Sequence, residues 1–300
     1  MFQLCIELTN RKWSSFLIKH FAKSKVSRLL IPTFIKTFQL NMDESFYDKK
    51  EFKSLHALFT RPLKTDVRPV AAGQNIVVSP VDGVCKERGI IEEGATFKVK
   101  GQLYSLSDML GSEHEGRKYE EGYYVIFYLS PRDYHRIHSP FECIVKESKL
   151  LGNRSYPVNQ LGLLYGKQPL SLNYRQVNYL YRNNNVTAMI EVGAMNINTI
   201  VRTKKEADWD KAEEVGHFSF GSTVILLFEK KFISSYTYAV RGENGRRNWP
   251  LYFIKKRLAN SQVFIHFLPE KIFHCRNKAS SHLLQSSYPL ELQYDKLTGR

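Results

Sequence analysis

The segment EVGHFSFGSTVILLFEK, residues 214–230, decides the fold expected for this chain. Its apolar run VILLF (224–228) is typical of a buried strand. Gly221, Ser222 and Thr223 stand directly before that run, although a strand requires no such entry. Two interpretations follow: Ser222 is an ordinary turn residue, or it carries a reactive hydroxyl.

Short β-rich runs bounded by Gly, Pro, Asn or Ser precede this segment. They are NIVVSP (75–80), TFKVKG (96–101), YYVIFYLSP (123–131), NVTAMIEVG (185–193), NINTIVRT (196–203) and STVILLFEK (222–230). LHALF (55–59) predicts a short helix, SLSDMLG (105–111) predicts a helical turn capped by Ser107, and Pro32 is expected to end or kink a first helix. We therefore expect an α+β, β-rich fold, with a mixed or antiparallel β body and N-terminal helices.

The net charge of +15 is concentrated at the two ends of the chain. Residues 1–40 hold seven basic residues and one acid, and residues 231–300 hold twelve basic and four acidic residues. Such ends suit an anionic surface, either phospholipid or nucleic acid. The nearly neutral centre shows no basic patch, so a nucleic-acid binder ranks last.

The N-terminal basic residues alternate with aromatic and aliphatic ones. Two interpretations of this segment stay open: helices that lie in a membrane interface, or a helix that packs on its own domain. The sequence has no apolar run near the roughly 18–20 residues that a membrane span requires, and no signal-peptide pattern. The four cysteines are scattered without a CxxC pair, which argues against a disulfide framework or a thiolate metal site and favours a reducing compartment.

Three clusters hold residues that could do chemistry. Asp82 lies in the turn SPVDGV (79–84), where an Asp-Gly pair is most often structural. His135 and His138 lie in YLSPRDYHRIHSP (128–140), where a metal site, two structural histidines and a general base all remain open, and no third metal ligand is near in sequence. Ser222, His135 and Asp82 are the types needed for a nucleophile, a base and an orienting group, but spacing alone does not show that they meet.

Several motifs found in order identify a resemblance. LHALFTRPLKTDVRPV, SPVDGV, KVKGQLYSLSDMLG, YLSPRDYHRIHSP, GNRSYPVNQLG, VGAMNINTI and GHFSFGSTVILLFEK together resemble the pyruvoyl-dependent phosphatidylserine decarboxylases, most closely the bacterial type, over roughly residues 1–230. The resemblance implies self-cleavage between Gly221 and Ser222, with chains 1–221 and 222–300 as products. It implies Asp82, His135 and Ser222 as catalytic residues, His138 as an assisting residue, and no metal.

The implied chemistry uses these residues in sequence. His135, held by Asp82, takes the proton of Ser222, whose oxygen attacks the Gly221 carbonyl. Elimination then leaves a pyruvoyl group derived from Ser222. This cofactor forms a Schiff base with phosphatidylserine and acts as the electron sink for loss of CO2, which yields phosphatidylethanolamine. Arg154 is a speculative phosphate contact, with a solvated loop arginine as the alternative.

The resemblance, taken with the charge distribution, implies three regions: a basic amphipathic membrane-associating helical segment (1–45), a decarboxylase catalytic domain (46–230) and a basic atypical tail (231–300) that departs from the family. It also implies a peripheral location on the cytoplasmic side of the cell membrane. The closing pattern G-x-x-V-x-x-G-E-x-I-G is not found after Glu229. A shifted reading frame near Lys230 and a lineage-specific extension both remain open. An unprocessed, non-catalytic membrane-binding relative is the alternative function, and a homo-oligomer is left open.

Overall fold

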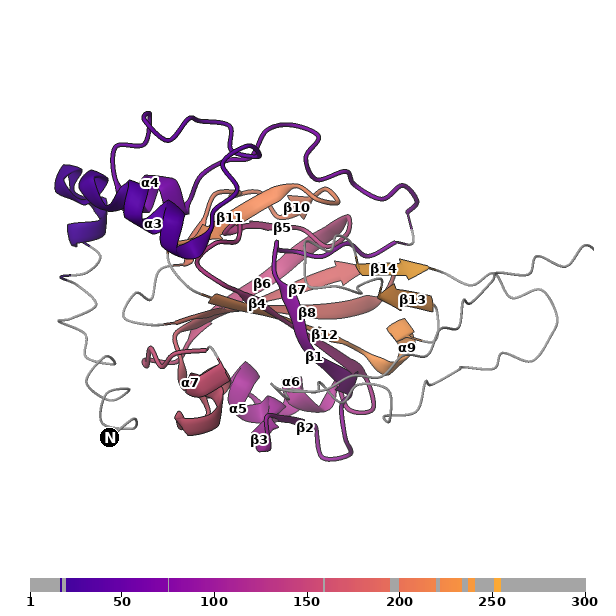
Figure 1. The fold of residues 1–300 in the computed structure, drawn as a ribbon. Coiled ribbons are helices and arrows are strands. Elements are labelled where there is room, and N and C mark those ends of the chain that lie inside the picture. Colours follow the sequence, from indigo (N-terminus) through magenta and orange to yellow (C-terminus); the bar gives the residue numbers. More distant parts are fainter. Residues whose placement is uncertain are drawn as a thin grey trace, which may run out of the picture. The chain divides into compact units, whose positions relative to one another are not determined.

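A seven-stranded antiparallel sheet forms the centre of the fold in this computed structural model (Figure 1). The structure describes residues 17, 20–74, 76–158, 160–194, 200–219, 222–233, 237–240 and 251–254. The strands of this sheet are, in spatial order, β1 (Val84–Ile90), β4 (Tyr123–Leu129), β12 (Ser222–Phe228), β8 (Asn185–Gly193), β7 (Arg175–Arg182), β6 (Cys143–Leu151) and β10 (Asp208–Trp209).

The β12 strand lies near the middle of this sheet, between β4 and β8. Its side chains are apolar in an unbroken run because both faces of the sheet are covered. Ile225 and Leu227 belong to one core cluster, and Val224, Leu226 and Phe228 belong to the other. The buried strand expected from VILLF is therefore confirmed.

Helices and a small hairpin cover the first face, which we call the helix face. Phe97, Leu106 and Met109 pack there against Ile225 and Leu227. The elements on this side are the hairpin β2 (Thr96–Val99) and β3 (Gln102–Ser105), and the helices α5 (Leu106–Leu110), α6 (Glu113–Arg117), α7 (Gln160–Tyr165) and α8 (Pro169–Leu172).

A three-stranded antiparallel sheet covers the second face, which we call the small-sheet face. Its order is β5 (Arg136–His138), β11 (Glu214–Phe218) and β9 (Ile200–Arg202). Ile137 and Phe218 pack in the same cluster as Val224 and Leu226 of the large sheet.

The N-terminal helices pack on the segment before β1. They are the 3-10 helix η1 (Lys25–Leu30), α3 (Ile31–Phe38) and α4 (Leu55–Phe59). Ile31 is buried against Phe52 and Leu58, so one side of this segment packs on its own domain. The helix η1 ends at Leu30 and Pro32 lies in the first turn of α3, where it needs no hydrogen-bonding N–H, so the expected end of a helix at this proline is confirmed.

Residues beyond β12 are described only in part. The short helix α9 (Lys230–Ile233) follows β12, and β13 (Thr237–Val240) pairs with β14 (Leu251–Ile254). The other residues of the basic tail 231–300, and with them the question of its origin, lie outside the described residues.

The predicted fold class is confirmed, whereas some local predictions need correction. NIVVSP is not a strand in its described residues 76–80, because Val78 donates its N–H to Pro140 in an irregular segment. The cap of α5 is Ser105, whose side chain accepts from Ser107 N. The sequence analysis did not predict β1 or β6, which mix exposed and half-buried residues without a regular pattern, or β7, which is mostly buried but carries polar residues among its apolar ones.

Candidate active site

The loop between β4 and β5 carries His135 and is held by its own side chains. Asp133 Oδ2 accepts from the N–H and from the hydroxyl of Ser130, at 2.7 Å each. Burial raises the pKa of Asp133 despite these two bonds. The carbonyl of His135 accepts from the N–H of Phe218 at 2.9 Å. The loop is therefore fastened to the last residue of β11.

The His135 ring is fully buried. Its Nδ1 donates to the carbonyl of Asp133 at 2.8 Å, which leaves the lone pair on Nε2. Nε2 has no hydrogen-bond partner among the described residues, and the ring of Phe59 lies against the imidazole with centroids 3.8 Å apart. Burial lowers the pKa of His135 to about 3, and the charge of Arg61 acts in the same direction. His135 is therefore a neutral imidazole at physiological pH.

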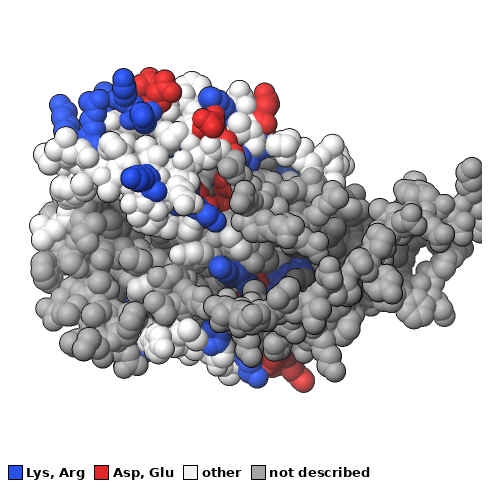
Figure 2. Space-filling model, viewed as in Figure 1, with Lys and Arg blue, Asp and Glu red and all other residues white. Residues whose placement is uncertain are grey.

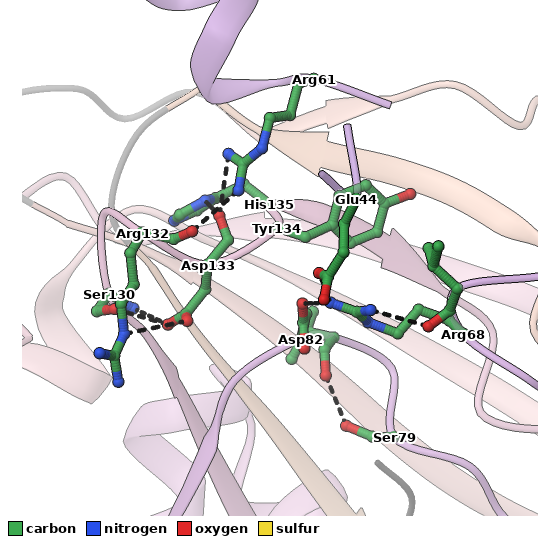
Figure 3. A network of polar contacts seen from close by, with 12 residues as sticks. Glu44, Arg61, Arg68, Ser79, Asp82, Ser130, Arg132, Asp133, Tyr134 and His135 are labelled. Carbon is green, nitrogen blue, oxygen red and sulfur yellow. Dashed lines mark hydrogen bonds and ion pairs between the residues drawn. The ribbon is translucent and has the colours of Figure 1, made fainter. Parts of the chain in front are cut away.

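Arg61 fixes this loop from the other side (Figure 3). Its guanidinium is buried, and it donates to the carbonyl of Arg132 at 2.9 Å and to that of Asp133 at 3.5 Å. Asp133 O therefore receives a hydrogen from both Arg61 and His135. Desolvation lowers the pKa of Arg61, an expected cost for a guanidinium that binds backbone carbonyls.

His138 has a different environment. Its Nδ1 donates to the carbonyl of Ala212 at 2.8 Å, and its Nε2 accepts from the hydroxyl of Tyr134 at 3.1 Å. Burial lowers the pKa of His138, while the charges of Glu214 and Asp82 act to raise it. The backbone N–H of His138 donates to the carbonyl of Pro80 at 2.8 Å, two residues before Asp82.

Asp82 lies in a tight turn beside β5. Ser79 donates its hydroxyl to the carbonyl of Val81 at 2.7 Å. A Cβ at Gly83 would lie 2.7 Å from the carbonyl oxygen of Tyr128, so only glycine lets the turn approach β4 this closely. Gly83 therefore has a structural role in SPVDGV. The position of the Asp82 carboxylate depends instead on the side chains that it contacts.

The carboxylate of Asp82 pairs with an arginine and not with His135. Arg68 Nη2 donates to Asp82 Oδ2 at 2.6 Å and to Glu44 Oε2 at 2.8 Å. The expectation that Asp82 directly holds His135 is therefore corrected: the acceptor for His135 Nδ1 is the backbone of Asp133. Figure 3 shows the Arg68 pair and the His135 loop as two neighbouring networks.

Ser222 begins β12, and Gly221 lies outside the described residues. In the backbone register Ser222 stands between Leu129 of β4 and Gly193 of β8. Phe218, the end of β11, binds His135 through its backbone. Only three residues separate Phe218 from Ser222 in the sequence, so the Gly221–Ser222 bond follows closely on a residue that binds the His135 loop. The Ser222 side chain lies outside the description.

Asn173 supports the strand edge next to Ser222. Its Nδ2 donates to the carbonyls of Gly193 and Tyr156, at 2.9 and 2.8 Å, and its Oδ1 accepts from Tyr156 N. This buried amide ties the loop GNRSYPVN to the residue that pairs with Ser222. Arg154 in that loop is exposed, and its backbone bridges to Asn173, so its suggested phosphate contact remains a proposal.

The sequence analysis missed Arg61, Arg68 and Asn173. Both arginines directly precede a proline, in TRP and VRP, but nothing in that pattern indicates which groups they contact. Their roles follow from contacts between residues far apart in the chain. Among the described residues, no group of three His, Cys, Asp or Glu is placed to hold a metal ion, and no helix is long and apolar enough to cross a membrane.

Comparisons with known proteins cover most of the chain. The sequence model of the family described as Phosphatidylserine decarboxylase matches residues 55–244. A Phosphatidylserine decarboxylase proenzyme of Bacillus mycoides (strain KBAB4) is 45% identical over 246 residues, which span 82% of this chain and 94% of that protein. The proteins of the same name from Bacillus thuringiensis subsp. konkukian (strain 97-27) and Bacillus cereus (strain ATCC 10987 / NRS 248) are each 46% identical over 233 residues, or 78% of this chain and 89% of theirs.

Proposed function

The chain belongs to the phosphatidylserine decarboxylase family, and we propose that it makes its own pyruvoyl group from Ser222. It is an enzyme that decarboxylates phosphatidylserine to phosphatidylethanolamine. The word proenzyme in the relatives' names supports a precursor that is cleaved. In this chain the proposed cleavage separates residues 1–221 from 222–300. No observation favours the alternative of an unprocessed, non-catalytic relative.

The observation that carries this proposal is the position of the Gly221–Ser222 bond. It lies between Phe218, which is bonded to the loop of a buried neutral histidine, and a strand that is paired on both sides. Strand pairing fixes the Ser222 backbone. The lone pair of His135 Nε2 is buried and has no partner among the described residues, which leaves it available as a base. These features suit the formation of a pyruvoyl group at this residue.

Self-cleavage needs two proton removals by the protein. A base takes the Ser222 hydroxyl proton, and the oxygen attacks the Gly221 carbonyl so that the amide becomes an ester. A base then removes the Ser222 Cα proton, and the ester oxygen leaves with Gly221 as a new carboxyl terminus. The dehydroalanine that remains becomes an imine, and water hydrolyses it to a ketone and ammonia. Asp82 supplies a negative charge that acts on His138.

The two histidines are the candidate bases, and different contacts favour each. His135 has the unpartnered Nε2 and the backbone link to β11. His138 has the influence of the Asp82 charge and the hydroxyl of Tyr134 on its Nε2. We propose His135 as the base for self-cleavage and His138 as the assisting residue. The cleavage rates of His135→Ala and His138→Ala distinguish this assignment from the reverse one.

The chemistry supplied by a pyruvoyl group is that of an electron sink: its carbonyl captures the amine of the substrate and accepts the electron pair left by CO2. The protein must then return a proton to the substrate carbon. The buried Tyr134 and the half-buried His138, joined at 3.1 Å, are candidates for such a transfer. Burial raises the pKa of Tyr134 above its usual value, so the hydroxyl stays protonated.

The N-terminal segment exposes apolar side chains that could contact a membrane holding the lipid substrate. Val26, Leu29 and Leu30 of η1 are exposed, with 63, 79 and 44% of their area accessible. Figure 2 shows lysine and arginine side chains gathered over the region of η1 and α3. We propose that this surface, within residues 1–45, docks on the cytoplasmic side of the cell membrane as a peripheral contact.

One set of measurements tests the self-processing. On denaturing gels the wild-type protein should give two chains, and intact-mass spectrometry should find a break before residue 222 and a carbonyl that reacts with hydrazine or borohydride. Ser222→Ala should remain one chain of 34.9 kDa without activity. Thr187→Val, at the far end of the same sheet, is the matched control and should be processed normally. A wild-type protein that stays whole would overturn the proposal.

A second measurement tests the membrane surface. Leu29→Ser should weaken binding to vesicles of phosphatidylserine and phosphatidylglycerol by at least about tenfold, since burial of one leucine side chain contributes about 1.5–3 kcal/mol. Leu150→Ser, on β6 and 60% exposed, is the control and should bind like wild type. Equal loss in both variants would show that the η1 surface has no special role.

A further inference from the structure

Arg68 joins two carboxylates through a single nitrogen. Nη2 lies 2.6 Å from Asp82 Oδ2 and 2.8 Å from Glu44 Oε2, so each of its two hydrogens meets one acid. The three side chains are largely buried, with 17–20% of their area exposed. Desolvation acts to lower the pKa of Arg68, but the two acids outweigh it and raise that pKa.

The residues that hold Arg68 come from connected segments. The N–H of Lys64 donates to the carbonyl of Glu44 at 2.9 Å, and Ser45 bridges to Leu63. Glu44 is therefore fixed to the chain that leads to Arg68. Arg68 Nη1 also donates to the carbonyl of Val67 at 2.9 Å. The backbone of Val67 and the carboxylate of Glu44 thus hold the guanidinium in the position from which it donates to Asp82.

We propose that Arg68 is a positioning residue for self-cleavage, which fixes the carboxylate of Asp82 beside the site while Glu44 anchors Arg68 from the other side. This inference rests on the proposed role of Asp82. It assigns no contact between Arg68 and the reacting atoms. Arg68 acts only through Asp82.

The charges at this point explain why the arginine is needed. Arg68 donates hydrogen bonds to both acids, whereas Arg61 acts on Glu44 and Asp82 through its charge. Without Arg68, the carboxylates of Glu44 and Asp82 face each other with little solvent to screen them, and like charges in such surroundings repel strongly. Asp82 then moves away from Glu44 and out of its place beside β5. Glu44 therefore has opposite effects on self-cleavage. It favours cleavage when Arg68 is present and slows cleavage when Arg68 is absent.

The test follows self-cleavage in protein made by pulsed cell-free translation and resolved on denaturing gels over time. Arg68→Met should slow cleavage by at least about tenfold, because a charge-assisted hydrogen bond is lost at an ordered acid. Arg68→Lys keeps the positive charge but loses the forked guanidinium. Its cleavage rate should therefore lie between those of Arg68→Met and the wild type. Glu44→Gln in the wild-type chain should slow cleavage by about threefold.

The decisive variant is the double substitution. Glu44→Gln should accelerate cleavage when Arg68 is already methionine, since it removes the repulsion that acts on Asp82. A purely structural role for either residue predicts further slowing instead. Arg117→Met is the matched control, because Arg117 pairs with Glu113 on the surface of α6 at 71% exposure and should leave the rate unchanged.

Folding is checked separately in Ser222→Ala protein, which stays one chain. Thermal unfolding of the Arg68 variants in that background shows whether the fold survives. If Arg68→Met does not fold, Glu44→Gln alone decides: slower cleavage supports the proposal, and a wild-type rate overturns it. Cleavage of folded Arg68→Met at the wild-type rate, or a double variant slower than Arg68→Met, also overturns it. Absence of cleavage in wild-type protein instead refutes the proposed function on which it rests.

Discussion

The two faces of the large sheet are covered by different elements, helices and a hairpin on one side and a small sheet on the other. On the helix face the buried charge is Arg175, which donates to the carbonyls of Met109, Asp108 and Asn173. Desolvation lowers its pKa to about 10, so it stays charged at neutral pH. On the small-sheet face the fully buried groups His135 and Glu191 have pKa values moved to about 3 and about 7.

This difference indicates that the buried charge on the helix face stabilises the fold, whereas the small-sheet face holds groups suited to proton transfer. The charge on the helix face serves packing, because its hydrogens reach carbonyls at the end of α5 and in the neighbouring loop. The small-sheet face holds groups whose protonation changes on folding, and one of them has an unpartnered nitrogen. We expect substitution of apolar groups on the helix face to change stability alone, and substitution of the titrating groups on the other face to change how stability depends on pH. All measurements below use Ser222→Ala protein so that the chain stays whole.

The largest stability effect is expected from the helix face. Ile225→Ala leaves a cavity in the middle of β12 and should lower the free energy of unfolding by about 2–5 kcal/mol. Urea unfolding measures this, and the loss should be the same at pH 5 and pH 8. Leu150→Ala, at an exposed position, is the control with little effect. A loss that changed strongly with pH would remove the distinction between the faces.

Because of His135 on the small-sheet face, the free energy of unfolding should fall in acid. Its folded pKa is about 3 against an ordinary 6.5, so between these values the unfolded chain binds a proton that the folded chain does not. Stability therefore falls as pH falls below 6.5, by about 1.4 kcal/mol per pH unit for this group. His135→Asn should show a correspondingly flatter acid limb in urea unfolding. The exposed His114→Asn on α6 should follow wild type, and parallel curves for His135→Asn would contradict the prediction.

Glu191 should act in the opposite direction over a narrower range. It is hydrogen-bonded to Asn178 at 2.9 Å, and burial raises its pKa to about 7 from 4.5. Here the folded chain holds a proton that the unfolded chain releases, so stability falls as pH rises from 4.5 to about 7. Glu191→Gln should remove this fall, whereas the surface variant Glu147→Gln should keep it. An unchanged slope would show that Glu191 is ionised in the folded protein.

The smallest effect is expected from a hydroxyl of the small-sheet face. Thr187 is 1% exposed on β8, and its Oγ1 has no hydrogen-bond partner among the described residues. Thr187→Val removes a buried polar atom at nearly constant volume, so it should raise the unfolding free energy by about 1 kcal/mol or less. Differential scanning calorimetry resolves such a change. A clear loss of stability would mean that the hydroxyl has a partner in solution.

Much of the architecture could be predicted from local pattern. The apolar runs of β4, β8 and β12 are long and uninterrupted because each strand is covered on both faces, and their predicted ranges agree with the structure. Segments with mixed exposure, such as β6, gave no such pattern. NIVVSP has strand composition, but its hydrogen bonds go to an irregular partner, which composition does not reveal.

The candidate site divides in the same way. Asp82, His135, His138 and Ser222 were predicted as chemistry-bearing types in turns and at strand ends, and the resemblance assigned their roles. Their partners were not predictable, because Asp82 meets Arg68 and His135 meets Asp133 and Arg61 through side-chain geometry. The direct Asp82–His135 contact was wrong for this reason.

The sequence alone determined the β-rich fold, the family and the residue types placed around residues 221 and 222, since periodicity and ordered motifs are local properties of the chain. Only the tertiary structure decided which groups are buried, which nitrogen lacks a partner and which arginine holds Asp82. Those properties depend on removal from water and on distances between segments up to about 160 residues apart, as for His56 and Ser219. No local pattern encodes either of them.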